Sequence, residues 1–224
     1  MRWRATTPHP VLVEALGPVA GAASDIRDHL GSLFIESVAA RPRLILELGT
    51  RGGVSTRALL AAAQVTGAQV LSVDIEDCSQ IDMPARFLDR WTFVRADDLE
   101  FAGAPFERAC ADRGLPPLAE VIFIDTSHRL EHTRAEIAAW TRRLAPRGVM
   151  MFHDTNMGAG WYRKLDGKVE RGRETTRGVI QAIEEHVGRQ YAEDSFFTDV
   201  AGGYAICHVP WSSGFTILRK LEDA

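Results

Sequence analysis

The chain has few cysteines, no excess of basic residues and no long hydrophobic run. Its three cysteines, Cys78, Cys110 and Cys207, are odd in number and far apart, which fits neither a disulfide framework nor a Cys-x-x-Cys metal site. A formal net charge of −4 disfavours an extended nucleic-acid partner. The first ten residues include Arg2 and Arg4 but no apolar core of signal-peptide length, and no later window resembles a membrane span. We therefore expect a cytoplasmic chain with reduced thiols and no membrane partner.

The length and the pattern of hydrophobic residues predict one α/β domain with a helical extension. A chain of 224 residues can bury a sizeable core as a single domain. Residues 10–40 have helical periodicity, which the pair Arg41-Pro42 ends. The boundaries predicted are an N-terminal helical extension over 1–40 and a main domain over 41–224. The extension could cover a ligand or build a homo-oligomer, and the sequence leaves both open.

Strand and helix patterns alternate after residue 41. The predicted strands are 44–48, 69–74, 91–95, 120–125 and 148–153, and the predicted helices between them are 54–64, 102–112 and 130–144. This alternation predicts a doubly wound, mostly parallel sheet with helices on both faces. A polar, glycine-bearing loop over 156–176 is interpreted as a lid. A helix over 177–187 and an antiparallel hairpin, with strands at about 193–198 and 202–209, complete a seven-stranded sheet.

The stretch from Leu44 to Ser55 joins a buried-strand pattern to a helix start through a glycine-rich turn. Such a turn brings backbone N–H groups and a helix N-terminus close to a ligand. A dinucleotide site needs Gly-x-Gly-x-x-Gly, and Arg51 takes the place of its second glycine. Glu47 would repel a phosphate, but it could accept hydrogen bonds from a cationic or hydroxyl-bearing ligand.

This Glu-x-Gly-x-x-x-Gly pattern resembles motif I of the class I S-adenosylmethionine-dependent methyltransferases. The resemblance implies a Rossmann-like fold with an antiparallel C-terminal hairpin, and a cofactor site that includes Glu47, Gly49, Thr50, Gly53 and Ser55. Asp74 ends a strand about 20–25 residues beyond the glycine loop, where an acid binds ribose hydroxyls. By the resemblance, Asp97 is placed to receive the adenine amino group. Asp98 is its rival, and a helix N-cap is the simpler account of either residue.

Two acidic residues end successive predicted strands, Asp125 in VIFIDTSH and Asp154 in GVMMFHDT. Neighbouring strands lie roughly 5 Å apart, so these carboxylates would emerge together at the carboxyl edge of the sheet. Two converging acids suit Mg²⁺ or another divalent cation. The strings Phe-Ile-Asp-x-x-His and Phe-His-Asp-Thr resemble metal-dependent small-molecule O-methyltransferases of the macrolide-sugar and catechol types, and the cephalosporin-hydroxylase-like group. This likeness covers about residues 42–155.

The resemblance implies catalytic roles for Asp125 and His128. Asp125 and Asp154 would bind the metal, with Asp125 also in the cofactor site, and His128 would act as general base. His153 is the candidate third ligand, with a packed strand-end histidine as the alternative. The remaining histidines without a partner pattern are treated as surface or core residues: His9, His132, His186 and His208.

We therefore predict an S-adenosylmethionine-dependent O-methyltransferase. Its acceptor would be a hydroxyl of a small natural product, a glycoside or polyketide in a biosynthetic pathway such as that of an antibiotic. Two other functions remain open at this point, an NAD(P)-dependent oxidoreductase on the same kind of sheet and a non-catalytic cofactor-binding protein.

Overall fold

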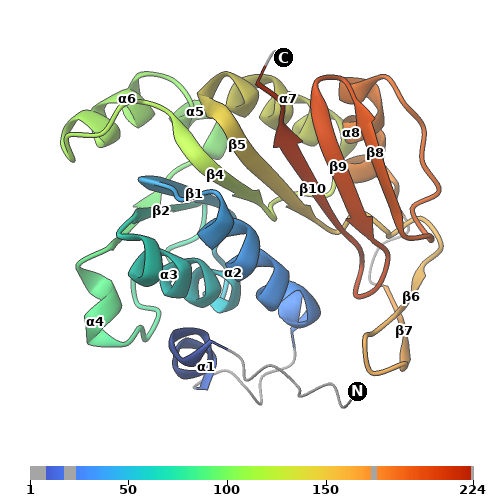
Figure 1. Cartoon of the computed structure of the whole chain (residues 1–224), viewed down its shortest axis with the longest axis horizontal. Helices are drawn as coiled ribbons and strands as arrows, with labels where there is room; N and C mark the ends of the chain where they lie inside the picture. The colour runs from blue at the N-terminus through green and yellow to red at the C-terminus, as the bar shows by residue number, and fades with distance from the viewer. Residues whose placement is uncertain (1–8, 18–23, 173–175, 223–224) are drawn as a thin grey trace, which may run out of the picture.

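The computed structural model describes residues 9–17, 24–172 and 176–222. Parts of the predicted extension over 1–40 and of the predicted lid over 156–176 lie outside the described residues. Within them, one eight-stranded sheet runs through the molecule in the order β3-β2-β1-β4-β5-β10-β9-β8 (Figure 1). Its strands are β1 (Leu44–Leu48), β2 (Gln69–Asp74), β3 (Trp91–Arg95), β4 (Ala119–Ile124), β5 (Leu144–His153), β8 (Phe197–Ala201), β9 (Tyr204–Val209) and β10 (Phe215–Lys220).

The strand order places a ligand crevice between β1 and β4. The chain proceeds outward from β1 to β2 and β3, then returns to pair β4 with the other side of β1, and β5 follows; all these pairings are parallel. The direction of winding therefore reverses between β1 and β4. In open α/β sheets, ligands bind at the carboxyl ends of the strands at such a reversal.

Helices cover both faces of the sheet (Figure 1). On one face lie α1 (Pro10–Leu16), the 3-10 helix η2 (Asp25–His29), α2 (Leu30–Ala39), α3 (Val54–Thr66) and α4 (Ala85–Leu88). On the other face lie α5 (Asp98–Phe101), α6 (Ala104–Ala111), α7 (Leu130–Trp140) and α8 (Gly178–Val187), with η3 (Thr141–Arg143) after α7. None of the described helices combines the length and hydrophobicity needed to cross a bilayer.

Alternation along the central strands divides the core into two layers. In β1, Leu44, Leu46 and Leu48 pack with α5 to α8, whereas Ile45 packs with α1 to α4. All five residues of β1 are buried. This burial on both faces explains the continuous hydrophobic run by which the strand was predicted.

The C-terminal part differs from the predicted hairpin by one strand. The predicted mixed α/β fold is confirmed, but the main sheet has eight strands because β10 lies between β5 and β9, antiparallel to both. The missed strand is six residues long, follows a Ser-Ser-Gly turn and ends in Arg219 and Lys220. These features weaken its hydrophobic pattern.

A small hairpin occupies part of the predicted lid. Strands β6 (Trp161–Arg163) and β7 (Val169–Arg171) form a separate two-stranded antiparallel sheet. The backbone N–H of Leu165 donates to Asp28 Oδ2 at 3.0 Å, and the N–H of Ser212 donates to the Arg163 carbonyl at 3.0 Å. The hairpin is thus attached to η2 and to the β9–β10 turn.

Candidate active site

The glycine loop touches the end of the neighbouring strand β4 directly. Gly49 has a φ of +86°, and a Cβ built there would lie 2.0 Å from the carbonyl oxygen of Asp125. Only glycine allows this approach. The N–H groups of Thr50 and Arg51 donate to Asp74 Oδ2 at 2.7 and 3.0 Å. Asp74 therefore holds the loop after β1 against the end of β2.

Glu47 lies beneath the loop and not in it. Its carboxylate is fully buried and accepts hydrogen bonds from Ser55 Oγ at 2.7 Å, Thr56 Oγ1 at 2.8 Å and Ser72 Oγ at 2.5 Å. Burial raises the pKa of Glu47 to about 7, against the opposing effect of the three hydroxyl donors. In the structure Glu47 thus has a role in loop packing, and its direct contact with the cofactor remains a prediction.

Two cavities flank the glycine loop. The larger, of about 290 Å³, extends along the ends of β2, β3 and β4, and the smaller, of about 150 Å³, lies between the loop and residues Ser24 to Ile26. Six of the predicted cofactor residues line one or both cavities: Gly49, Thr50, Ser55, Asp74, Asp97 and Asp125. Gly53 lines neither; with a φ of +72° it forms the N-cap of α3.

Asp97 is both a helix cap and a residue of the cavity wall. Its Oδ1 accepts hydrogen bonds from the N–H groups of Leu99 at 2.9 Å and Glu100 at 3.1 Å, as an N-cap residue does. The rival residue Asp98 is buried at the start of α5, and it also lines the cavity.

The two strand-end acids converge as predicted from neighbouring parallel strands. One potential ligand atom from each of Asp125, His128 and Asp154 lies within 4.8 Å of the others. His128 Nε2 is 2.7 Å from Asp154 Oδ2. Asp154 has a φ of 57°, unusual for a residue other than glycine. The backbone turns at this residue, directly after the last residue of β5, His153.

His153 lies behind the two acids. Its ring is fully buried, with Nδ1 3.4 Å from Asp125 Oδ1 and 3.2 Å from Asp154 Oδ2, and Nε2 3.2 Å from the Ser212 carbonyl oxygen. Burial lowers the pKa of His153, but the two carboxylates outweigh burial and raise that pKa well above its usual value. Burial alone would raise the pKa of Asp154, yet His153 and His128 hold it well below its usual value.

His153 is not a member of the cation-sized group, so its ligand role remains a prediction. The third member of the cation-sized group is His128.

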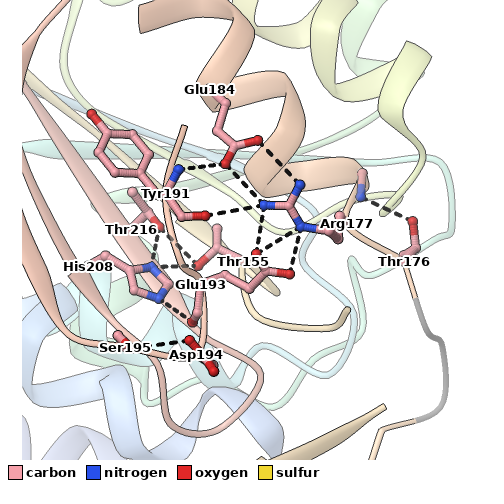
Figure 2. A network of polar contacts seen from close by, with 11 residues as sticks. Thr155, Thr176, Arg177, Glu184, Tyr191, Glu193, Asp194, Ser195, His208 and Thr216 are labelled. Carbon is pink, nitrogen blue, oxygen red and sulfur yellow. Dashed lines mark hydrogen bonds and ion pairs between the residues drawn. The ribbon is translucent and has the colours of Figure 1, made fainter. Parts of the chain in front are cut away.

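A polar network fixes the segments around this group (Figure 2). Thr216 Oγ1 donates to Thr155 Oγ1 at 2.9 Å, and His208 Nδ1 lies 2.8 Å from Thr216 Oγ1. The Arg177 guanidinium lies between the carboxylates of Glu184 and Glu193. Sequence reasoning missed this network because its members are distant in the chain.

Arg177 also bears on the loop that carries His128. Arg177 immediately precedes α8, whose first residue is Gly178. A Cβ built on Gly178 would lie 2.1 Å from the His128 carbonyl oxygen. The start of α8 therefore packs directly against the His128 backbone. The Arg177 network therefore helps to fix the start of α8, which in turn contacts the backbone of the candidate catalytic histidine.

A second group of ionisable residues lies in the wall of the larger cavity. His132 Nε2 is 3.2 Å from Asp98 Oδ1 and 3.5 Å from Glu136 Oε1. A hydrogen bond with Glu136 raises the pKa of His132 to about 9, and burial raises the pKa of Glu136 to about 7. His132 had been treated as a residue without partners, although the spacing of four between His132 and Glu136 would have shown that they share a helix face.

Comparison with known proteins agrees with this fold. Residues 46–155 match the profile of a family described as a methyltransferase domain. No curated protein sequence gives a significant match.

Three solved structures illustrate the fold. An O-methyltransferase from Bacillus cereus with S-adenosylhomocysteine has 18% identity and a TM-score of 0.58, with 96% of this chain and 93% of that chain covered. TomG from Streptomyces achromogenes, an O-methyltransferase of tomaymycin synthesis, has 17% identity and a TM-score of 0.57, covering 96% and 91%. MycE of the mycinamycin pathway, with Mg and S-adenosylhomocysteine, has 17% identity and a TM-score of 0.56, covering 96% and 55%.

The domain match over residues 46–155 and the sheet topology support a class I S-adenosylmethionine-dependent methyltransferase. Its fold is that of the O-methyltransferases in this class. The two alternatives left open by the sequence, an oxidoreductase and a non-catalytic binding protein, give way to this assignment.

Proposed function

We propose that the chain methylates a hydroxyl of a small natural product, a glycoside or a polyketide, with the help of a divalent cation. The observation that carries the proposal is the convergence of the side chains of Asp125, His128 and Asp154. The backbone of Asp125 also touches the glycine loop at Gly49, and Asp125 lines the larger cavity. Supporting it, MycE holds Mg with S-adenosylhomocysteine, and TomG acts in the synthesis of a natural product.

The residues present suit a divalent cation. Asp125 and Asp154 offer two carboxylates, and the side chain of Asp154 is buried. Carboxylates with water and substrate oxygens are the ligands that Mg²⁺ and Mn²⁺ prefer. When bound, the cation would stabilise negative charge on the acceptor oxygen.

The chain's own residues account for binding and proton transfer. The glycine loop, Asp74 and Asp97 would hold S-adenosylmethionine, whose sulfonium makes its methyl group an activated one. His128 would take the proton of the acceptor hydroxyl, since a neutral imidazole is the side chain best matched to proton transfer near neutral pH. An acceptor bound at this group would lie beside the cofactor, and this proximity would lower the entropic part of the barrier.

The 2.7 Å contact between His128 Nε2 and Asp154 Oδ2 also supports a variant without metal. A carboxylate that accepts from one ring nitrogen fixes the imidazole tautomer and stabilises the imidazolium formed on proton transfer, as the aspartate of a Ser-His-Asp triad does. In this variant Asp154 orients the base and binds no cation. Both variants keep the methyl transfer, and they differ in their response to chelation.

The test uses S-adenosylmethionine with a labelled methyl group and a panel of hydroxylated glycosides and polyketides. We expect label on an acceptor oxygen, loss of turnover in EDTA and recovery with Mg²⁺ or Mn²⁺. Unchanged turnover in EDTA would leave the metal-free variant, and label on nitrogen, sulfur or carbon alone would contradict the O-methyltransferase.

A binding experiment separates the cation from turnover. Titration calorimetry with Mn²⁺ should show at least a tenfold weaker affinity in Asp154→Asn than in the wild type. Asp112→Asn, which alters an exposed carboxylate after α6, is the matched control and should bind Mn²⁺ as the wild type does. Equal affinities in all three proteins would remove the cation from this site.

A further inference from the structure

The group Asp98, His132 and Glu136 has the dimensions of a cation site. One potential ligand atom from each residue lies within 4.8 Å of the others, and the contacts from His132 Nε2 to the two carboxylates measure 3.2 and 3.5 Å. Ligands at about 2.0–2.2 Å from a tetrahedral ion are separated by roughly 3.3–3.5 Å. The spacing of these atoms therefore matches adjacent ligands of one small ion.

Two buried oxygens of this group lack partners. Asp98 Oδ2 and Glu136 Oε2 accept no hydrogen bond from the residues that the structure describes. The side chain of Glu136 is fully buried and that of Asp98 is only 9% exposed. A buried carboxylate oxygen without a partner carries a desolvation cost, which a bound cation would offset.

The surrounding contacts hold this group in place beside the larger cavity. Thr126 Oγ1 donates to Glu136 Oε1, so the Glu136 carboxylate is held in position. Asp98 and His132 line the larger cavity, so an ion could enter from that side, and water could complete its coordination. Asp98 comes from the start of α5, whereas His132 and Glu136 lie one turn apart on α7.

We propose that Asp98, His132 and Glu136 form a second divalent-cation site, which takes a Zn²⁺-like ion. One imidazole nitrogen and two carboxylates suit Zn²⁺ or Co²⁺ better than Mg²⁺, which favours an all-oxygen shell with several waters. The ion would tie α5 to α7 and stiffen the wall of the cofactor cavity. This site is separate from the methyl-transfer proposal, and neither depends on the other.

The first test measures cobalt binding without any assay of activity. Metal-free protein is prepared in the Asp154→Asn background, which weakens the first site, and titrated with Co²⁺ while its visible absorption is recorded. We expect one equivalent with visible bands, and at least a tenfold loss of affinity after Glu136→Gln. Glu131→Gln, on the exposed side of the same helix, is the matched control and should leave the affinity unchanged. Equal affinity with and without Glu136→Gln would overturn the proposal.

A second measurement does not depend on how well the variants fold. Crystals of the wild-type protein are soaked in Zn²⁺, and anomalous diffraction is recorded at the zinc edge. A peak between Asp98, His132 and Glu136 is expected. Zinc found only beside Asp125 and Asp154, or no zinc at all, would show that the proton on His132 alone balances the two carboxylates and would overturn the second site.

Discussion

The candidate site has two halves, the glycine loop and the ends of β4 and β5, and their acidic side chains have different kinds of partner. At the glycine loop, Asp74 accepts from backbone N–H groups and Glu47 accepts from three hydroxyls. At the end of β4 and β5, by contrast, charged groups face one another: Asp125 and Asp154 contact His128 and His153. The carboxylates of the first half are paired with uncharged donors, whereas those of the second half are paired with histidines. This difference agrees with the proposal, in which the loop holds the cofactor and the strand ends act on a proton and a cation.

The largest effect is expected on turnover, at the ends of β4 and β5, where His128 would take the proton. His128→Ala should lower kcat by about 10²–10⁴, the usual contribution of a general base, while the affinity for S-adenosylhomocysteine stays within twofold of the wild type. Methyl-transfer assays and calorimetry measure the two quantities. His186→Ala, at an exposed position on α8, serves as the control. A His128→Ala protein with wild-type kcat would remove the general base from the mechanism.

The next largest effect is expected on cofactor binding at the glycine loop. Gly49→Ala would place a methyl group 2.0 Å from the Asp125 carbonyl oxygen at a positive φ, so the loop must move. We expect S-adenosylhomocysteine to bind about 100-fold more weakly, which corresponds to about 3 kcal/mol. Gly52→Ala, where the added Cβ meets no atom within 4 Å, should bind as the wild type does. If both variants bind equally well, the close contact between the two loops does not shape the cofactor site.

The same contrast explains what the sequence could predict. The parallel core and the glycine loop were predictable because each depends on residues close together in the chain, as in the buried run of β1. The convergence of Asp125 and Asp154 followed from strand order alone. The position of His153 behind the carboxylates did not, because it depends on the β9–β10 turn at Ser212. The Asp98 and His132 pairing was missed for the same reason, since it joins two separate helices.

A pH series would test whether Glu47, beneath the glycine loop, is protonated in the folded protein. Because the pKa of Glu47 is raised from 4.5 to about 7 on folding, the folded chain holds this proton more tightly than the unfolded chain. The free energy of unfolding should therefore fall as pH rises through that window, by on the order of 3 kcal/mol for this group at about 1.4 kcal/mol per pKa unit. Glu136 adds a similar slope, since burial raises its pKa to about 7 as well.

Glu47→Gln isolates the first of these two contributions. Urea unfolding between pH 4.5 and 7 should give a shallower loss of stability in this variant than in the wild type, so the difference in unfolding free energy shifts in favour of Glu47→Gln as pH rises. Glu131→Gln, which alters an exposed carboxylate, should follow the wild-type curve. Parallel curves for Glu47→Gln and the wild type would mean that Glu47 is ionised in the folded protein throughout this range.

The smallest expected effect separates the two roles of Asp97. Serine is as good an N-cap as aspartate, so Asp97→Ser should keep the hydrogen bonds to Leu99 and Glu100 and change the stability by less than about 0.5 kcal/mol. It removes the carboxylate from the cavity wall, so a cofactor contact at Asp97 predicts about tenfold weaker binding of S-adenosylhomocysteine, or about 1.4 kcal/mol. Calorimetry and urea unfolding on the same samples give both numbers. Unchanged affinity would make Asp97 a helix cap only, and would leave adenine recognition to the backbone and side chains that end β4.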